Sequence, residues 1–93
     1  MTTADRYTHI RYDVLPVEMR DGARDYVERG LQPGGFMLAV LRNDFIDAVT
    51  RADPINRACL HDWAMWLWNE APSKCWGSAA KVENWIEARE AGE

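Results

Sequence analysis

The residues of this chain that could do chemistry are Asn, Arg and Trp side chains that flank its apolar segments. Asn offers a donor and an acceptor side by side, and Arg grips phosphate groups with a planar fork. Trp stacks on flat rings and on Arg. Together these types predict a pocket for a small nucleotide-type ligand. The candidate ligand-binding residues are Asn43, Asp44, Arg51, Asn56, Arg57, Asn69 and Trp76.

The same polar residues have a structural alternative, because Asn and Asp side chains often hydrogen-bond the backbone at helix ends. This alternative is favoured for Asn69, which lies shortly before the helix stop at Pro72. For Asn43 and Asn56 the two interpretations are equally supported.

The Trp residues divide into two groups by their position on one predicted helix. Trp63 and Trp66 fall on its apolar stripes, which predicts that they are core residues. Trp68 lies off these stripes and is therefore the candidate for an interface with another protein.

No spacing of nucleophile, base or metal ligand indicates an enzyme. Cys59 and His61 are two positions apart on a predicted helix, so their side chains point in different directions. The chain contains no Cys-x-x-Cys and no His-x-x-x-His pattern. Cys75, beside Trp76 in a loop, is either packed under a helix corner or a reactive thiol. We predict no catalytic residue, no metal site and no cofactor.

Composition restricts the partners of the chain. Its net charge is -4, which argues against a general nucleic-acid binder and against binding to an anionic membrane. No stretch approaches the roughly 20 apolar residues of a membrane span. The first ten residues have no apolar core, so we expect no signal peptide and a cytoplasmic location.

Helix signals predict an all-α fold, a compact bundle of about four helices with short loops. Residues 1–93 form a single helical domain in which residues 1–13 are an irregular N-terminal arm. Pro16 suits a first helical position and Gly30 a helix end, whereas Asp53-Pro54 marks a restart. The wide apolar surface predicted for the third helix also predicts a homo-oligomer. The predicted helices cover about residues 16–29, 36–51, 54–70 and 79–89.

Several short segments carry a resemblance to known proteins. They are Pro33-Gly34-Gly35-Phe36, Ala39-Val40-Leu41-x-Asn43-Asp44-Phe45, Arg51-Ala52-Asp53-x-x-Asn56 and Asn69-x-Ala71-Pro72-x-x-Cys75-Trp76-Gly77-Ser78. With them the chain resembles a class of short accessory proteins encoded in tailed-phage and prophage genomes, over about residues 14–85. The Asn-Asp-Phe and Cys-Trp-Gly-Ser segments are the most specific parts.

The resemblance implies a setting, the cytoplasm of a phage host, and no catalytic residue. Small accessory phage proteins commonly act by binding, so a counter-defence role follows as an expectation. We expect a non-enzymatic protein that sequesters a small nucleotide-type immune signal in its Trp/Asn/Arg pocket. The alternative is an inhibitor or adaptor that docks on a host defence or phage protein through Trp68 and an acidic face.

Overall fold

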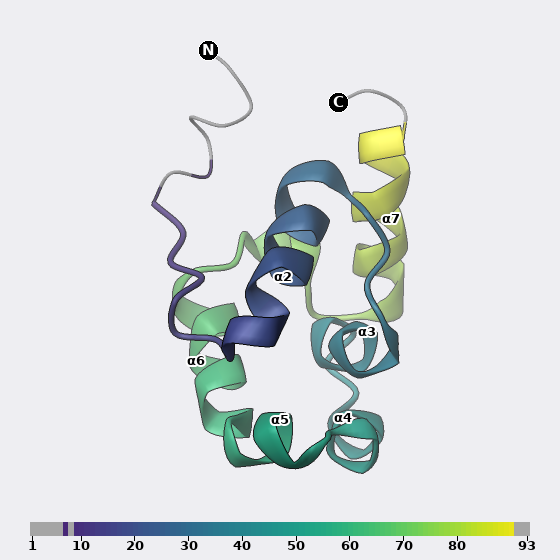
Figure 1. The fold of residues 1–93 in the computed structure, drawn as a ribbon. Coiled ribbons are helices and arrows are strands. Elements are labelled where there is room, and N and C mark those ends of the chain that lie inside the picture. Colours follow the sequence, from purple (N-terminus) through teal and green to yellow (C-terminus); the bar gives the residue numbers. More distant parts are fainter. Residues whose placement is uncertain (1–6, 8, 91–93) are drawn as a thin grey trace.

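The computed structural model describes Tyr7 and residues 9–90, and this part of the chain is helical without any strand (Figure 1). The all-α class is therefore confirmed, but the described part has six α-helices where about four were predicted. A short 3-10 turn, η1, covers Ser73–Cys75. The helices are α2 (Val17–Arg29), α3 (Gly35–Leu41), α4 (Phe45–Arg51), α5 (Pro54–Ala58), α6 (Leu60–Asn69) and α7 (Ala79–Glu90).

The prediction of one helix over residues 36–51 is wrong, because the chain turns sharply between α3 and α4. Asn43 has a φ of 61°, a left-handed conformation that ends a helix and that Asn tolerates better than most residues. Asp44 then begins α4 as its N-cap, since its carboxylate accepts a hydrogen bond of 3.2 Å from the Asp47 amide. Asn43 therefore ends the first helical segment, and Asp44 begins the second.

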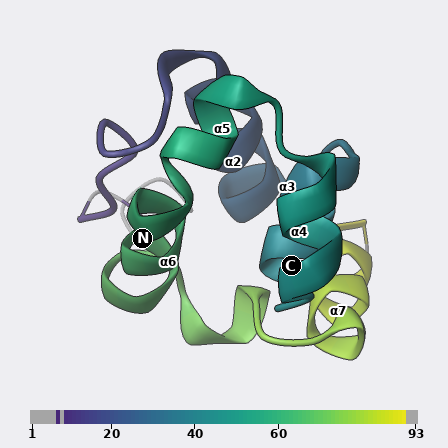
Figure 2. The same ribbon diagram turned by 90° about the horizontal axis from the view of Figure 1, so that it is seen from below.

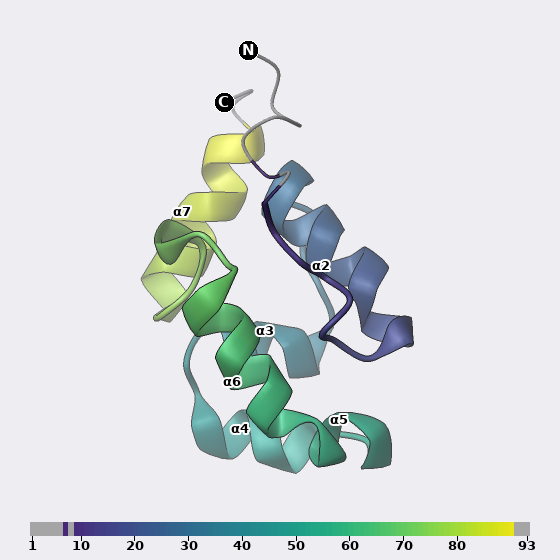
Figure 3. The same ribbon diagram turned by 90° about the vertical axis from the view of Figure 1, so that its left-hand side faces the viewer.

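The prediction of one helix over residues 54–70 is also wrong. Its start is as expected: the Asp53 carboxylate accepts a hydrogen bond of 2.8 Å from the Asn56 amide, and Pro54 is the first residue of α5. The helix ends after one turn at Cys59, where φ is -111° and ψ is 17°. The chain then re-enters helical geometry as α6, which points in a new direction (Figure 3).

The C-terminal helix α7 packs closely against the end of α2. Gly30 has a φ of 69° and its amide donates to the Tyr26 carbonyl, as expected for a glycine that follows a helix. A Cβ at this position would lie 2.3 Å from the Cβ of Arg89 in α7. Only glycine therefore allows α7 to pack against this end of α2.

Hydrogen bonds from the buried Tyr26 and the half-buried Trp85 join three elements around the core. The Tyr26 hydroxyl donates to the Cys75 carbonyl at 2.6 Å, and Trp85 Nε1 donates to the Tyr26 carbonyl at 3.1 Å. These two bonds connect α2, η1 and α7. Trp63 and Trp66, each 1% exposed, are core residues as predicted. The largest fully buried side chains are Trp63, Trp66, Tyr26, Leu15, Leu41, Val27, Val82 and Cys75.

The described part of the N-terminal arm is irregular, as predicted, and it is packed against the helices. Tyr7, Ile10 and Tyr12 are all buried. The Tyr12 ring lies 6.0 Å from the Trp66 ring, and its hydroxyl donates to the Glu28 carboxylate at 3.0 Å. Burial, and then the neighbouring Glu28, raise the pKa of Tyr12 above its ordinary value. The remainder of the predicted arm, residues 1–6 and 8, lies outside the described residues.

Candidate functional sites

The predicted ligand residues do not gather in one cavity of the described structure. Asn43 and Asp44 are exposed and line a cavity between α4 and α6. Asn56 and Trp76 do not line it. The two helix breaks explain the separation, because each redirects the chain that follows it. The described residues therefore do not form a single pocket from Asn43, Asn56 and Trp76.

Asn56 has a structural partner instead. Its side chain is buried, and its Oδ1 accepts a hydrogen bond of 3.0 Å from Trp63 Nε1. A buried indole N–H without an acceptor destabilises the fold. Asn56 in α5 supplies that acceptor for Trp63 in α6, on the other side of the helix break at Cys59.

The two predicted arginines also lie apart from that cavity. Arg51 is exposed and pairs with Asp47 one turn earlier in α4, at 2.9 Å. Arg57 is exposed, and its guanidinium approaches the Ala52 carbonyl at 3.5 Å. These contacts are local to α4 and to the start of α5.

Asn69 and Trp76 occupy two further places. Asn69 is exposed and lines a separate cavity of about 130 Å³ with Val14, Met65 and others. Trp76 is half-buried and packs against the core, and its Nε1 has no hydrogen-bond partner among the described residues.

An apolar groove separates α4 from α6, which face each other and are bridged at one end by α5 (Figure 2). It encloses about 140 Å³. Buried side chains such as Trp63 and Leu67 form its floor, whereas Phe45 and Ala64 are exposed at its edges. The full lining is Ala39, Val40, Asn43, Asp44, Phe45, Ala48, Val49, Leu60, Trp63, Ala64 and Leu67.

Large apolar side chains stand beside this groove. Phe45 is 71% exposed and its neighbour Ile46 is 68% exposed. Trp68 is 75% exposed, so its predicted exposure is confirmed. It does not line the groove, but it follows Ala64, an edge residue of the groove, by four positions along α6. Concentrated exposed apolar area of this kind is typical of surfaces that bind other proteins.

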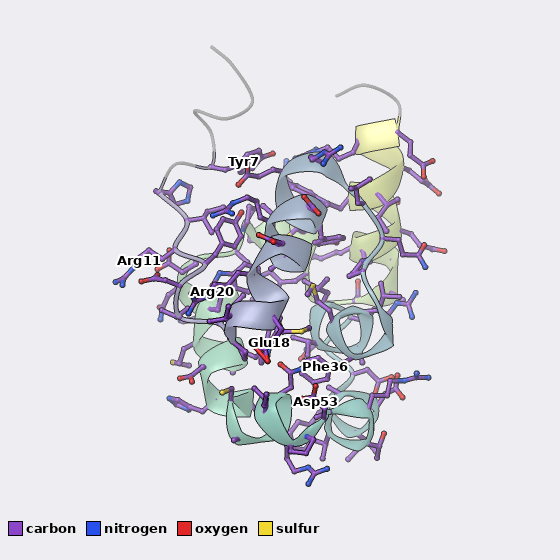
Figure 4. The ribbon with its side chains drawn as sticks, in the orientation of Figure 1. Tyr7, Arg11, Glu18, Arg20, Phe36 and Asp53 are labelled. Atoms are coloured by element: carbon purple, nitrogen blue, oxygen red, sulfur yellow. The ribbon has the colours of Figure 1, made fainter. Side chains whose placement is uncertain are left out.

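A larger cavity that the sequence did not predict lies between η1, α7 and the N-terminal segment. It measures about 630 Å³. Figure 4 shows Tyr7, one of its lining residues, at the end of the molecule opposite Phe36 and Asp53. The lining consists of Tyr7, His9, Pro72, Ser73, Lys74, Asn84, Trp85, Ala88 and Arg89.

Of the two possibilities for Cys75, the structure shows the packed one, because its side chain is fully buried. Burial raises the pKa of the Cys75 thiol to about 12, so the thiolate is scarce near neutral pH.

Within residues 7 and 9–90, no three His, Cys, Asp or Glu side chains gather where they could hold a metal ion. No helix in the described part of the chain is both long enough and apolar enough to cross a membrane.

Comparison of the chain with protein-family models, curated proteins and solved structures finds no match. Function is therefore inferred from the groove between α4 and α6 and from the cavity between η1, α7 and the N-terminal segment.

Proposed function

We propose that the protein is a non-enzymatic docking module that holds an amphipathic helix of a partner protein in the groove between α4 and α6. The supporting observation is an apolar groove with Phe45 at its edge, 71% exposed. Ile46 follows Phe45 in α4, and Trp68 follows the edge residue Ala64 by four positions in α6; each is more than two-thirds exposed. A helix that lays one apolar face into a groove is a recurrent mode of peptide recognition.

The size of the groove indicates what its centre accepts. Apolar cavities of about 150 Å³ accommodate a benzene molecule, so about 140 Å³ is room for one aromatic ring or branched aliphatic side chain. A nucleotide-type ligand fits poorly, because small-molecule sites usually measure about 300–1,000 Å³. If a partner covered Trp68 or Phe45, the apolar area removed from water would contribute about 2–4 kcal/mol for each.

The proposed setting follows the phage resemblance. The partner helix belongs to a host defence protein or to another phage protein, and binding in the host cytoplasm serves counter-defence. A homo-oligomer is the alternative use of the same surface, with a second copy of this chain in place of the partner.

Selection from a displayed library of helical peptides tests the proposal. Enriched peptides should carry apolar residues at i, i+3 or i+4 and i+7, with one large side chain at the centre. Their binding should be lost with Phe45→Asp and weakened with Trp68→Ala. Val17→Asp is the matched control, because Val17 is 69% exposed and does not line the groove.

Two results would count against this function. One is a library that yields no peptide whose binding depends on Phe45. The other is a dimer in light scattering that Phe45→Asp dissociates, which would assign the groove to a second copy of the chain.

A further inference from the structure

We infer that the cavity between η1, α7 and Tyr7 binds a phosphate-bearing ligand of nucleotide size. At about 630 Å³ it lies within the range of about 300–1,000 Å³ that small-molecule sites occupy. It shares no residue with the groove between α4 and α6, so the inference is independent of the docking function.

The charge of the lining favours an anion. Arg89 and Lys74 supply two cations and His9 an imidazole, and none of the described lining residues is acidic. Among the described residues, no carboxylate lies within 4 Å of the charged groups of Arg89 or Lys74, whereas four other arginines have such partners. A cationic cavity in a chain of net charge -4 concentrates anions locally.

Among the described residues, Arg89 is held by aromatic contacts and has no ion pair. Its guanidinium carbon lies 3.8 Å above the Trp85 ring and 5.9 Å from the centre of the Tyr7 ring. Nη2 donates to the Tyr7 hydroxyl, and Nε is buried without a partner among the described residues. Stacking on aromatic rings orients the guanidinium and leaves its charge available to a phosphate group.

The aromatic platform is fixed as well. Trp85 Nε1 donates to the Tyr26 carbonyl, which ties the indole to the end of α2. A site that is ordered before binding loses less conformational entropy when the ligand arrives. The cation and the aromatic groups are therefore preorganised on one wall of the cavity.

Neutral polar groups at the rim suit the remainder of a nucleotide. Asn84 and Ser73 are both exposed and line the cavity. The Asn84 amide can donate to and accept from the edge of a base, and the Ser73 hydroxyl can do the same with a sugar. A nucleotide in this cavity would place its phosphate beside Lys74 and Arg89 and its base near Trp85 and Asn84.

Titration calorimetry of the full chain tests the inference with inorganic phosphate, adenosine, and a panel of linear and cyclic nucleotides. At least one nucleotide should bind more tightly than phosphate and more tightly than adenosine. Lys74→Ala should weaken that binding about tenfold, as for one lost charge-assisted contact. Arg42→Ala is the matched control, because it also removes one exposed cation and Arg42 does not line the cavity.

NMR chemical shifts locate the ligand and protect the test against a misfolded variant. The Trp85 indole and the Asn84 side chain should shift with nucleotide, while residues of the α4–α6 groove should not. Three results would overturn the inference: no nucleotide binds at millimolar concentration, adenosine or phosphate alone binds as tightly as any nucleotide, or Lys74→Ala and Arg42→Ala weaken binding equally.

Discussion

Replacement of Asn56 by Ala distinguishes a ligand-binding residue from a structural one. Asn56 is 5% exposed, and its only side-chain hydrogen bond in the described structure is the one it accepts from Trp63 Nε1. If this bond is its role, Asn56→Ala destabilises the fold. If Asn56 serves a ligand, the same change leaves stability almost unaltered and weakens binding.

The expected loss follows from burial. Trp63 is 1% exposed, so without Asn56 its indole N–H has neither a protein acceptor nor water, which costs about 1–3 kcal/mol. The lost side-chain atoms leave a small cavity that adds about 1 kcal/mol. A total of about 2–4 kcal/mol would lower the Tm by roughly 10–25 °C for a chain of this length.

Urea denaturation followed by circular dichroism measures the loss, and a double-mutant cycle with Trp63→Phe assigns it. Phenylalanine has no N–H to satisfy, so Asn56→Ala should cost about 1–3 kcal/mol less in that background. Asn69→Ala is the matched control. Asn69 is exposed, and its replacement should change stability by no more than about 0.5 kcal/mol.

Two results would refute the structural role of Asn56. One is a loss below about 0.5 kcal/mol for Asn56→Ala, which is the usual effect of a surface change. The other is an equal loss in the wild-type and Trp63→Phe backgrounds, because the hydrogen bond would then contribute nothing to stability.

Two further predictions concern Asn43 and Cys75. Because Asn43 has a φ of 61°, Asn43→Gly should keep or raise the free energy of unfolding, whereas Asn43→Val should lower it by about 1–2 kcal/mol; equal effects in urea denaturation would contradict the left-handed turn. Burial raises the pKa of the Cys75 thiol from 9.0 to about 12, so the stability that this thiol contributes is complete below pH 9 and is lost as the pH rises toward 12. Urea denaturation across that interval should show a shallower decline for Cys75→Ala than for the control Cys59→Ala, and identical slopes would refute the assignment.

The sequence predicted those helix ends that local chemistry determines. Gly30 after α2 and Asp53-Pro54 before α5 act within a few residues, so their effect is visible without the fold. The turn at Asn43-Asp44 also had a local signal, a residue that tolerates positive φ followed by a good N-cap. The same two residue types also fit a ligand site, so the local signal alone does not decide between the two roles. The break at Cys59 carries no comparable signal, since no Gly or Pro marks it.

The cavities depend on contacts that sequence spacing does not encode. Lys74, Arg89 and Tyr7 come together from η1, α7 and the N-terminal segment. The spacing of Trp85 and Arg89, one helical turn apart, is the local signal that could have predicted a cation stacked on an aromatic ring. The apolar groove depends on the break at Asn43, because that break places α4 opposite α6.

The contact between Arg89 and Tyr7 joins residues 82 positions apart, and this has a consequence for how the chain folds. Synthesis runs from the N-terminus, yet Tyr7, Ile10 and Tyr12 have no complete core to enter until α6 and α7 exist. Formation of the native state is therefore a late event that requires nearly the whole chain. Until then the apolar run Phe36–Leu41 is uncovered, so a chain cut short before α7 would be prone to aggregation and degradation.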